Sequence, residues 1–254
     1  MIQKILIIIL SVSINLFASF EINFYMPFGF NFSFSSITLE RPNRLYESIK
    51  GDLGFDFALM FQTGYNLKLN NNLPIKSVSF LLDAGFYMQD INITYKLPKY
   101  NFYDNSDYYK ADDEFLFGGV SVGIIPKINF KNFSLGFGVG IRIPLVNEVS
   151  HQKLSDDTKL YYEGSLMYKD KSEWNFEDIK KVFKYPVFPY IKLSFDGFYY
   201  VTEKTSFMYG LYMLYDFSSP YNFNNIQTLQ KELIKKYELS SLSICIYIGV
   251  SFGR

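Results

Sequence analysis

The stretch FSLGFGVGIRIPL at residues 133–145 decides the fold. Its alternate residues fall into two sets. The first set is large and apolar: Phe133, Leu135, Phe137, Val139, Ile141, Ile143 and Leu145. The second set is small or polar: Ser134, Gly136, Gly138, Gly140, Arg142 and Pro144. Because successive side chains of a strand point to opposite faces, the stretch predicts a strand with one apolar face and one face of little bulk.

The same two-residue alternation recurs along the rest of the chain. It predicts seven further strands, at residues 21–35, 52–67, 75–94, 114–129, 187–201, 206–217 and 242–252. The connections alternate between long and short, with the long ones after the first, third, fifth and seventh strands. An antiparallel meander collects all long loops at one end, as outer-membrane barrels do. We therefore predict an all-β fold, an eight-stranded antiparallel up-and-down transmembrane β-barrel.

Composition excludes several classes of function. Lys and Arg number 25 and so do Asp and Glu, which gives a net charge of zero and no argument for nucleic-acid binding. The single Cys rules out internal disulfides and thiolate metal sites, and the single His removes most zinc and His-based catalytic sites. We expect no cofactor, no metal site and no catalytic residue, so we do not expect an enzyme.

The N-terminus predicts an export signal at residues 1–19, followed by the barrel at 20–254. Lys4 supplies a positive charge, residues 5–17 are apolar, and Ala18 and Ser19 are small residues suited to cleavage. The apolar core is shorter than the roughly 20 residues of a spanning helix. If the mature protein lies in a membrane, it therefore crosses as strands.

The two faces of the strands indicate which side points outward. An eight-stranded barrel has room inside only for side chains. The Gly, Ser and Ala face suits that crowded interior, and the face rich in Phe, Leu and Ile suits lipid. The alternative is a soluble sandwich or barrel with the faces reversed, which would leave stripes of Gly in water.

Alternation and loop pattern together resemble the small eight-stranded outer-membrane β-barrel class of Gram-negative-type bacteria. That class includes structural anchors, adhesins, small-molecule conduits and a few lipid-modifying enzymes. The last strand, 244–252, resembles the C-terminal signal that outer-membrane assembly machinery reads, although Gly253 and Arg254 follow its aromatic Phe252. The resemblance implies an outer-membrane location, contact with outer-membrane lipid, and assembly by that machinery.

Six charged residues lie on the predicted inward face: Asp56, Asp83, Arg142, Lys192, Asp196 and Asp216. Counting from the short-turn end suggests that all of them except Asp196 share a layer. Buried charges of opposite sign are expected to pair, because an unpaired buried charge costs several kcal/mol. Three interpretations remain open: an ionic plug, a polar conduit for small solutes, or paired carboxylates in acid–base chemistry.

The long loops contain two predicted short helices, one capped by Asn175 and one beginning near Asn224 or Asn225. The first has Glu177 four residues before Lys181. The apolar and aromatic loop residues either cover the barrel mouth or rest at the lipid interface, or they form an interaction surface for a host or extracellular ligand. They are Tyr103, Tyr108, Tyr109, Trp174, Phe176, Ile179, Phe183, Leu229 and Leu233.

His151 lies in the longest loop near Ser150, Ser155 and Asp156, a set that suggests Ser/His chemistry only weakly. We expect instead a monomeric structural or surface-interaction protein that presents long extracellular loops above a closed lumen. The alternative is a narrow, porin-like conduit for small or apolar solutes, and a minor alternative is a lipid-modifying outer-membrane enzyme.

Overall fold

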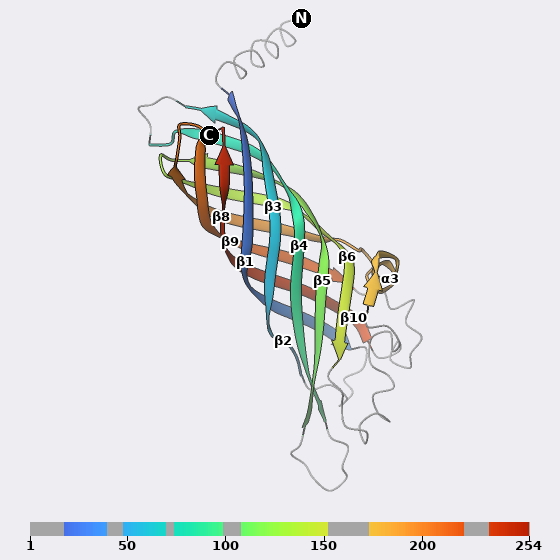
Figure 1. The fold of residues 1–254 in the computed structure, drawn as a ribbon. Coiled ribbons are helices and arrows are strands. Elements are labelled where there is room, and N and C mark those ends of the chain that lie inside the picture. Colours follow the sequence, from blue (N-terminus) through green and yellow to red (C-terminus); the bar gives the residue numbers. More distant parts are fainter. Residues whose placement is uncertain are drawn as a thin grey trace, which may run out of the picture.

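The computed structural model describes residues 18–39, 48–69, 74–98, 108–151, 173–220 and 234–253. Eight long strands form a closed antiparallel barrel (Figure 1). These strands are β1 (Ala18–Leu39), β3 (Leu53–Lys68), β4 (Ser77–Pro98), β5 (Tyr108–Asn129), β6 (Phe133–His151), β8 (Phe188–Tyr200), β9 (Thr205–Pro220) and β10 (Ile234–Phe252). The predicted fold class is confirmed.

Closure comes from the pairing of the first and last strands. Ile22 of β1 lies opposite Phe252 of β10, and β1 also pairs with β3 through Phe24 opposite Phe61. The remaining barrel strands each pair with their neighbours around the ring, including β4 with β5. A closed barrel leaves no unpaired strand edge, which is the condition for crossing a membrane with strands.

Successive connections alternate between the two ends of the barrel, and the longest of them join strands at the loop end. At the turn end they are residues 69–76, 130–132 and 201–204, and at the loop end the strands are joined through 40–47, 99–107, 152–172 and 221–233. The start of β1 and the end of β10 lie together at the turn end (Figure 1). β1 begins at Ala18, within the predicted signal segment, and the rest of that prediction falls outside the described residues.

Several strands extend further toward the loop end than the residues whose apolar alternation predicts them. β4 and β5 pair as far as Pro98 opposite Tyr108, so Tyr108 and Tyr109 lie in a strand and not in the predicted loop. β6 likewise continues to His151, beyond the predicted end at Leu145. The backbone hydrogen bonds of a strand need only a partner strand. Pairing can therefore continue beyond the point where the alternation of apolar and polar residues ends.

Three short elements complete the loop end: β2 (Ser48–Gly51), which pairs with β4, β7 (Glu173–Asn175), which pairs with β6, and the helix α3 (Phe176–Val182). The predicted cap of α3 is confirmed, because the Asn175 side chain accepts from the Asp178 backbone N–H in a capping box. The surface ion pairs are Glu177–Lys180 and Asp178–Lys181, in place of the expected Glu177–Lys181 pair. The second predicted helix lies outside the described residues. None of the described helices is long and apolar enough to cross a membrane.

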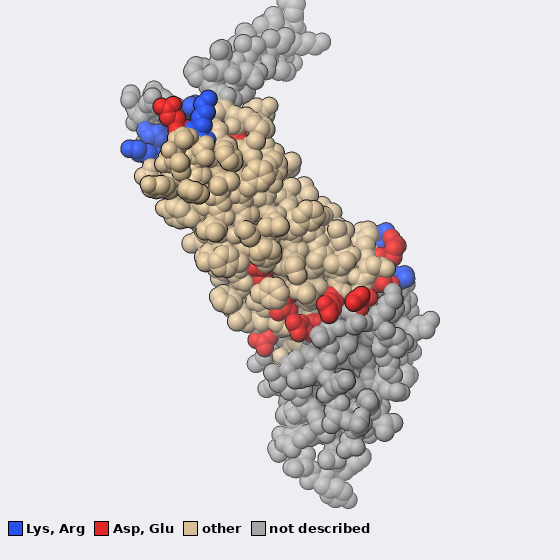
Figure 2. Space-filling model, viewed as in Figure 1, with Lys and Arg blue, Asp and Glu red and all other residues tan. Residues whose placement is uncertain are grey.

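The large apolar side chains point outward, as the alternation predicts. Phe86 is 67% exposed and Phe30 is 61% exposed, although both lie in the middle of long strands. Figure 2 shows a broad, largely uncharged band on the visible face, with mostly Lys and Arg at the turn end and mostly Asp and Glu where the band meets the loop end. Such a band, about 25 Å tall in known membrane barrels, is the surface that lipid covers.

The glycines of β5 and β6 make room for a tyrosine inside the barrel. Gly123 and Gly140 lie opposite each other, and a Cβ on Gly140 would stand 2.5 Å from the Tyr190 ring. A Cβ on Gly123 would come within 2.4 Å of the Tyr190 hydroxyl. Gly140, on the small face of residues 133–145, and Gly123 of β5 therefore leave the space into which Tyr190 of β8 packs.

Candidate functional site: a closed polar lumen

The first cluster of lumen charges lies toward the loop end and is centred on Arg142. Its guanidinium nitrogens lie 2.9 Å from Asp56 Oδ2 and 3.0 Å from Asp216 Oδ2. The guanidinium also stands over the Tyr87 ring, 4.7 Å from its centroid. Hydroxyls also donate to the Oδ2 atoms of the two carboxylates, Ser243 to Asp56 at 2.5 Å and Ser241 to Asp216 at 3.1 Å. Arg142 thus joins β6 to β3 and to β9 through the middle of the barrel.

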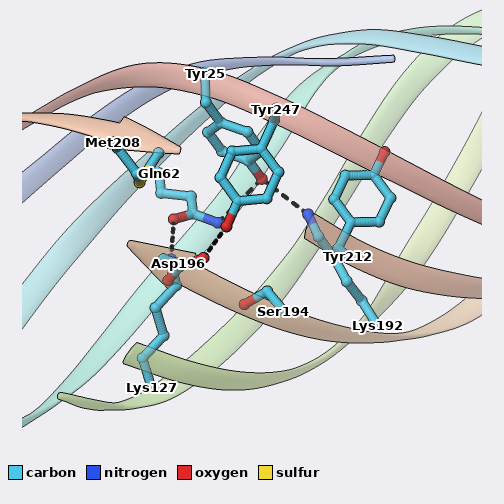
Figure 3. Close-up of a pocket in the computed structure, with 9 residues that line it drawn as sticks. All are labelled: Tyr25, Gln62, Lys127, Lys192, Ser194, Asp196, Met208, Tyr212 and Tyr247. Atoms are coloured by element: carbon cyan, nitrogen blue, oxygen red, sulfur yellow. Dashed lines mark hydrogen bonds and ion pairs between the residues drawn. The ribbon is translucent and has the colours of Figure 1, made fainter. Parts of the chain in front are cut away.

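The second cluster lies in the middle of the barrel and is centred on Lys192. Its ammonium is 2.7 Å from Asp83 Oδ2 and donates to the Tyr25 hydroxyl at 2.8 Å. Tyr25 in turn donates to Asp83 Oδ1 at 2.7 Å. The Tyr212 ring lies 4.6 Å from the ammonium, a cation–π contact. Figure 3 shows the Lys192 side chain reaching toward the Tyr25 hydroxyl, with the Tyr212 ring beside it.

The third cluster lies near the turn end and is centred on Lys127. Its ammonium is 2.8 Å from Asp196 Oδ2 and donates to Gln62 Oε1 at 2.8 Å (Figure 3). Asp196 also accepts from Ser134 at 2.5 Å and from the Tyr247 hydroxyl. The Gln62 amide donates to Tyr25 at 3.0 Å, so the second and third clusters form one hydrogen-bonded network.

The structure places all six charges of the predicted network inside the lumen and pairs each of them. It differs from prediction in their arrangement, because the five residues expected in one layer divide between two levels, the Arg142 cluster and the Lys192 cluster. Asp196, which the prediction leaves out of that layer, lies at a third level with Lys127. The level of a residue depends on strand stagger, which the residue count from the turn end does not contain. Lys127 was missed, although the alternation of β5 places it on the inward face beside Asn129. Glu21 was missed as a lumen charge and is also buried.

The lumen is closed at the level of the second and third clusters. The space there between Tyr25, Lys192, Asp196 and Tyr247 leaves no room for a water molecule. Buried ion pairs of this kind resist opening, because separating one leaves an uncompensated charge at a cost of about 3–5 kcal/mol. The described lumen is therefore a packed interior and not an open pore.

An aromatic roof closes the loop end of the lumen. The Trp174 ring lies 6.3 Å from Phe115, and Phe183 lies 6.2 Å from Phe117 and 5.5 Å from Phe188. The roof segment, residues 173–188, is hydrogen-bonded to β9. The Ser219 hydroxyl donates to the Tyr185 carbonyl at 2.5 Å, and the Lys184 N–H donates to the Pro220 carbonyl at 2.9 Å.

Most described residues of the proposed interaction surface belong to this roof. Trp174, Ile179 and Phe183 are no more than 2% exposed, and Phe176 is partly exposed. These side chains cover the mouth of the barrel, which was one of the two interpretations, and three of them are not free to meet a partner. Tyr103, Leu229 and Leu233 lie outside the described residues, as do the side chains of Tyr108 and Tyr109.

The described residues contain no group of three or more His, Cys, Asp or Glu side chains arranged to hold a metal ion. His151 ends β6 opposite Asp113 on β5. Ser155 and Asp156, with which a Ser/His site was considered, lie outside the described residues.

No family model and no curated protein matches the chain. Similar solved structures include the outer membrane protease OmpT from Escherichia coli, at 11% identity and a TM-score of 0.35 over 93% of this chain and 96% of that chain. OprG from Pseudomonas aeruginosa matches at 14% identity and a TM-score of 0.35, over 91% of this chain and 94% of that chain. Neisserial surface protein A matches at 12% identity and a TM-score of 0.33, over 91% of this chain and 97% of that chain. These values carry no functional inference. The barrel's own pairing and faces give it the architecture of the small eight-stranded outer-membrane β-barrel class.

Proposed function

We propose that this protein is a monomeric outer-membrane scaffold that presents its loop end to the exterior, with a lumen closed by ionic clusters. The observation that carries the proposal is the closure of the lumen by charges from non-neighbouring strands. Lys192 of β8 meets Asp83 of β4, and Arg142 of β6 meets Asp56 of β3. Each pair crosses the interior, where a conduit for solutes would need open space.

The distribution of chain length supports a role at the loop end. The turn-end connections have at most eight residues, whereas 21 residues, 152–172, separate β6 from β7 in the sequence, and α3 follows β7 at the loop end. Loops carried on a rigid scaffold are where binding residues concentrate. The partner proposed for these loops is a host or extracellular molecule, and the lipid-facing band would contact outer-membrane lipid.

Single-channel recording of the refolded protein in planar lipid bilayers tests the closed lumen. We expect no reproducible open levels, because the middle of the lumen does not admit water. Discrete and reproducible conductance steps would instead favour the alternative of a narrow conduit for small solutes. Arg142→Ala recorded in parallel shows whether the ionic clusters are what closes the path.

A loop replacement tests the surface role. Residues 152–172 are exchanged for a short Gly/Ser linker, and binding of the full-length and linker proteins to immobilised extracellular-matrix and serum proteins is compared. We expect the linker protein to keep its folded barrel and lose binding. Equal binding by the two proteins, or binding by neither, counts against a role for this loop.

A further inference from the structure

The buried charges of the described lumen do not balance. Eight charged side chains there are no more than 2% exposed. Five are carboxylates and three are cations: Glu21, Asp56, Asp83, Asp196 and Asp216 against Lys127, Arg142 and Lys192. Lys192 and Lys127 each neutralise one carboxylate, and Arg142 is shared by two. An excess of two negative charges remains, and one of them resides on Glu21.

Glu21 is held at the turn end of the lumen by neutral donors alone. Its Oε1 accepts from Asn23 Nδ2 at 3.0 Å, and its Oε2 accepts from Ser79 Oγ at 2.6 Å and from Asn66 Nδ2 at 3.3 Å. All three of these groups can donate to an ionised carboxylate, which only accepts. Among the described residues no cation contacts Glu21, so its charge has neutral partners only.

The two amides that bind Glu21 each leave an oxygen without a donor. Asn23 and Asn66 are 0% and 1% exposed, and their Oδ1 atoms have no hydrogen-bond partner. The carboxylate fixes this orientation, because a flipped amide would set oxygen against oxygen. Ser251 Oγ, on the residue that faces Asn23 from β10, is also buried and without a partner. Buried polar atoms are rarely left unsatisfied, so these three oxygens are available to a small ligand.

We propose that Glu21, Asn23 and Asn66 form a binding site for one small monovalent cation, with Na⁺ as the simplest occupant. A cation satisfies the negative charge and the free amide oxygens together, whereas an anion would be repelled. The site offers one carboxylate among neutral oxygens, and protein sites for divalent hard cations draw on more carboxylates. The proposed site lies at the turn end, away from the roof. Cation binding there does not depend on whether the lumen conducts.

The experiment compares thermal unfolding of the refolded full-length protein in detergent micelles in NaCl and in N-methylglucamine chloride at equal ionic strength. We expect a higher unfolding temperature in NaCl, rising by about 3–5 °C for each tenfold increase in Na⁺ above its dissociation constant. Glu21→Gln should abolish the difference. Glu177→Gln is the matched control, because that carboxylate is 70% exposed on α3, and it should leave the Na⁺ response unchanged.

A second measurement needs no variant. Broadening of the ²³Na resonance by the wild-type protein, reversed by excess K⁺ or Li⁺ but not by N-methylglucamine, reports the site directly. Identical unfolding temperatures in the two salts, with no broadening, overturn the proposal. A full Na⁺ response in Glu21→Gln overturns it as well, because the cation then binds elsewhere.

Discussion

The Lys192 ammonium lies 2.7 Å from Asp83 Oδ2, and both side chains are no more than 2% exposed. The two residues belong to β8 and β4, which are not neighbours in the barrel, so the pair joins opposite walls through the interior. Tyr25 contacts both members and closes a triangle of hydrogen bonds. This pair is the strongest candidate for the interaction that fixes the barrel's cross-section.

Replacing Lys192 with Met should destabilise the barrel by about 3–5 kcal/mol, because it leaves Asp83 buried without its cation. The measurement is urea unfolding of the refolded protein, followed by the gel mobility shift of the folded barrel. The double variant Lys192→Met/Asp83→Asn should recover part of the loss, since neither of the two positions then carries a buried charge. Lys180→Met, at an exposed ion pair on α3, serves as the control and should cost less than about 1 kcal/mol. A wild-type midpoint for Lys192→Met would contradict the structural role of the pair.

Arg142→Ala should lower the unfolding temperature in detergent micelles. The change leaves Asp56 and Asp216 near each other without the cation that both contact. The expected loss is again about 3–5 kcal/mol. Arg142→Lys should recover little of it, since one ammonium cannot reproduce two separate N–H contacts. An unchanged transition in Arg142→Ala would remove this cluster from the account of closure.

Gly140→Ala and Gly138→Ala, two residues apart on the same face of β6, should differ in their effect. A Cβ at Gly140 would lie 2.4 Å from the Val122 carbonyl and 2.5 Å from the Tyr190 ring, whereas the nearest atom to a Cβ at Gly138 is 3.2 Å away. We expect about 1–3 kcal/mol of destabilisation for Gly140→Ala from overpacking. Gly138→Ala should be closer to neutral, since Ala also lowers the entropy of the unfolded chain. Chemical denaturation measures both, and equal costs would mean that Tyr190 does not pack there.

The strands, their order and their outward face follow from the sequence alone, because alternation and connection length are local properties. The apolar list from Phe133 to Leu145 is the clearest case, and five of its seven members are at least 39% exposed. Lys127 was within reach of the same rule, since it lies two residues before Asn129 on the inward face of β5. Alternation could not predict which charges pair, because the level of each residue in the barrel depends on the register between strands. The ends of β5 and β6 were also beyond it, since pairing there continues past the apolar segment.

Phe137→Arg should test the direction of the apolar face. Phe137 is 52% exposed on β6, with Leu193 of β8 opposite it. If this face contacts the hydrocarbon core, an Arg near its middle costs about 2–4 kcal/mol. Folding into lipid vesicles across a urea series gives the difference directly. Asn132→Arg, in the exposed turn between β5 and β6, is the control and should change stability by no more than about 0.5 kcal/mol. Unimpaired folding of Phe137→Arg would place the apolar face away from lipid.

Asn175→Ala should loosen the roof while leaving the barrel intact. Asn175 caps α3, and losing such a cap costs about 1 kcal/mol of helix stability. Trp174 is the only Trp of the chain and is 2% exposed in the roof, so its fluorescence reports this segment alone. We expect greater quenching by acrylamide and a red-shifted emission in Asn175→Ala, with an unchanged gel mobility shift. Asn175→Asp, which keeps an accepting oxygen at the cap, should quench as the wild type does. Unchanged quenching in Asn175→Ala would mean that aromatic contacts with Phe115 and Phe117, and not the cap, hold the roof in place.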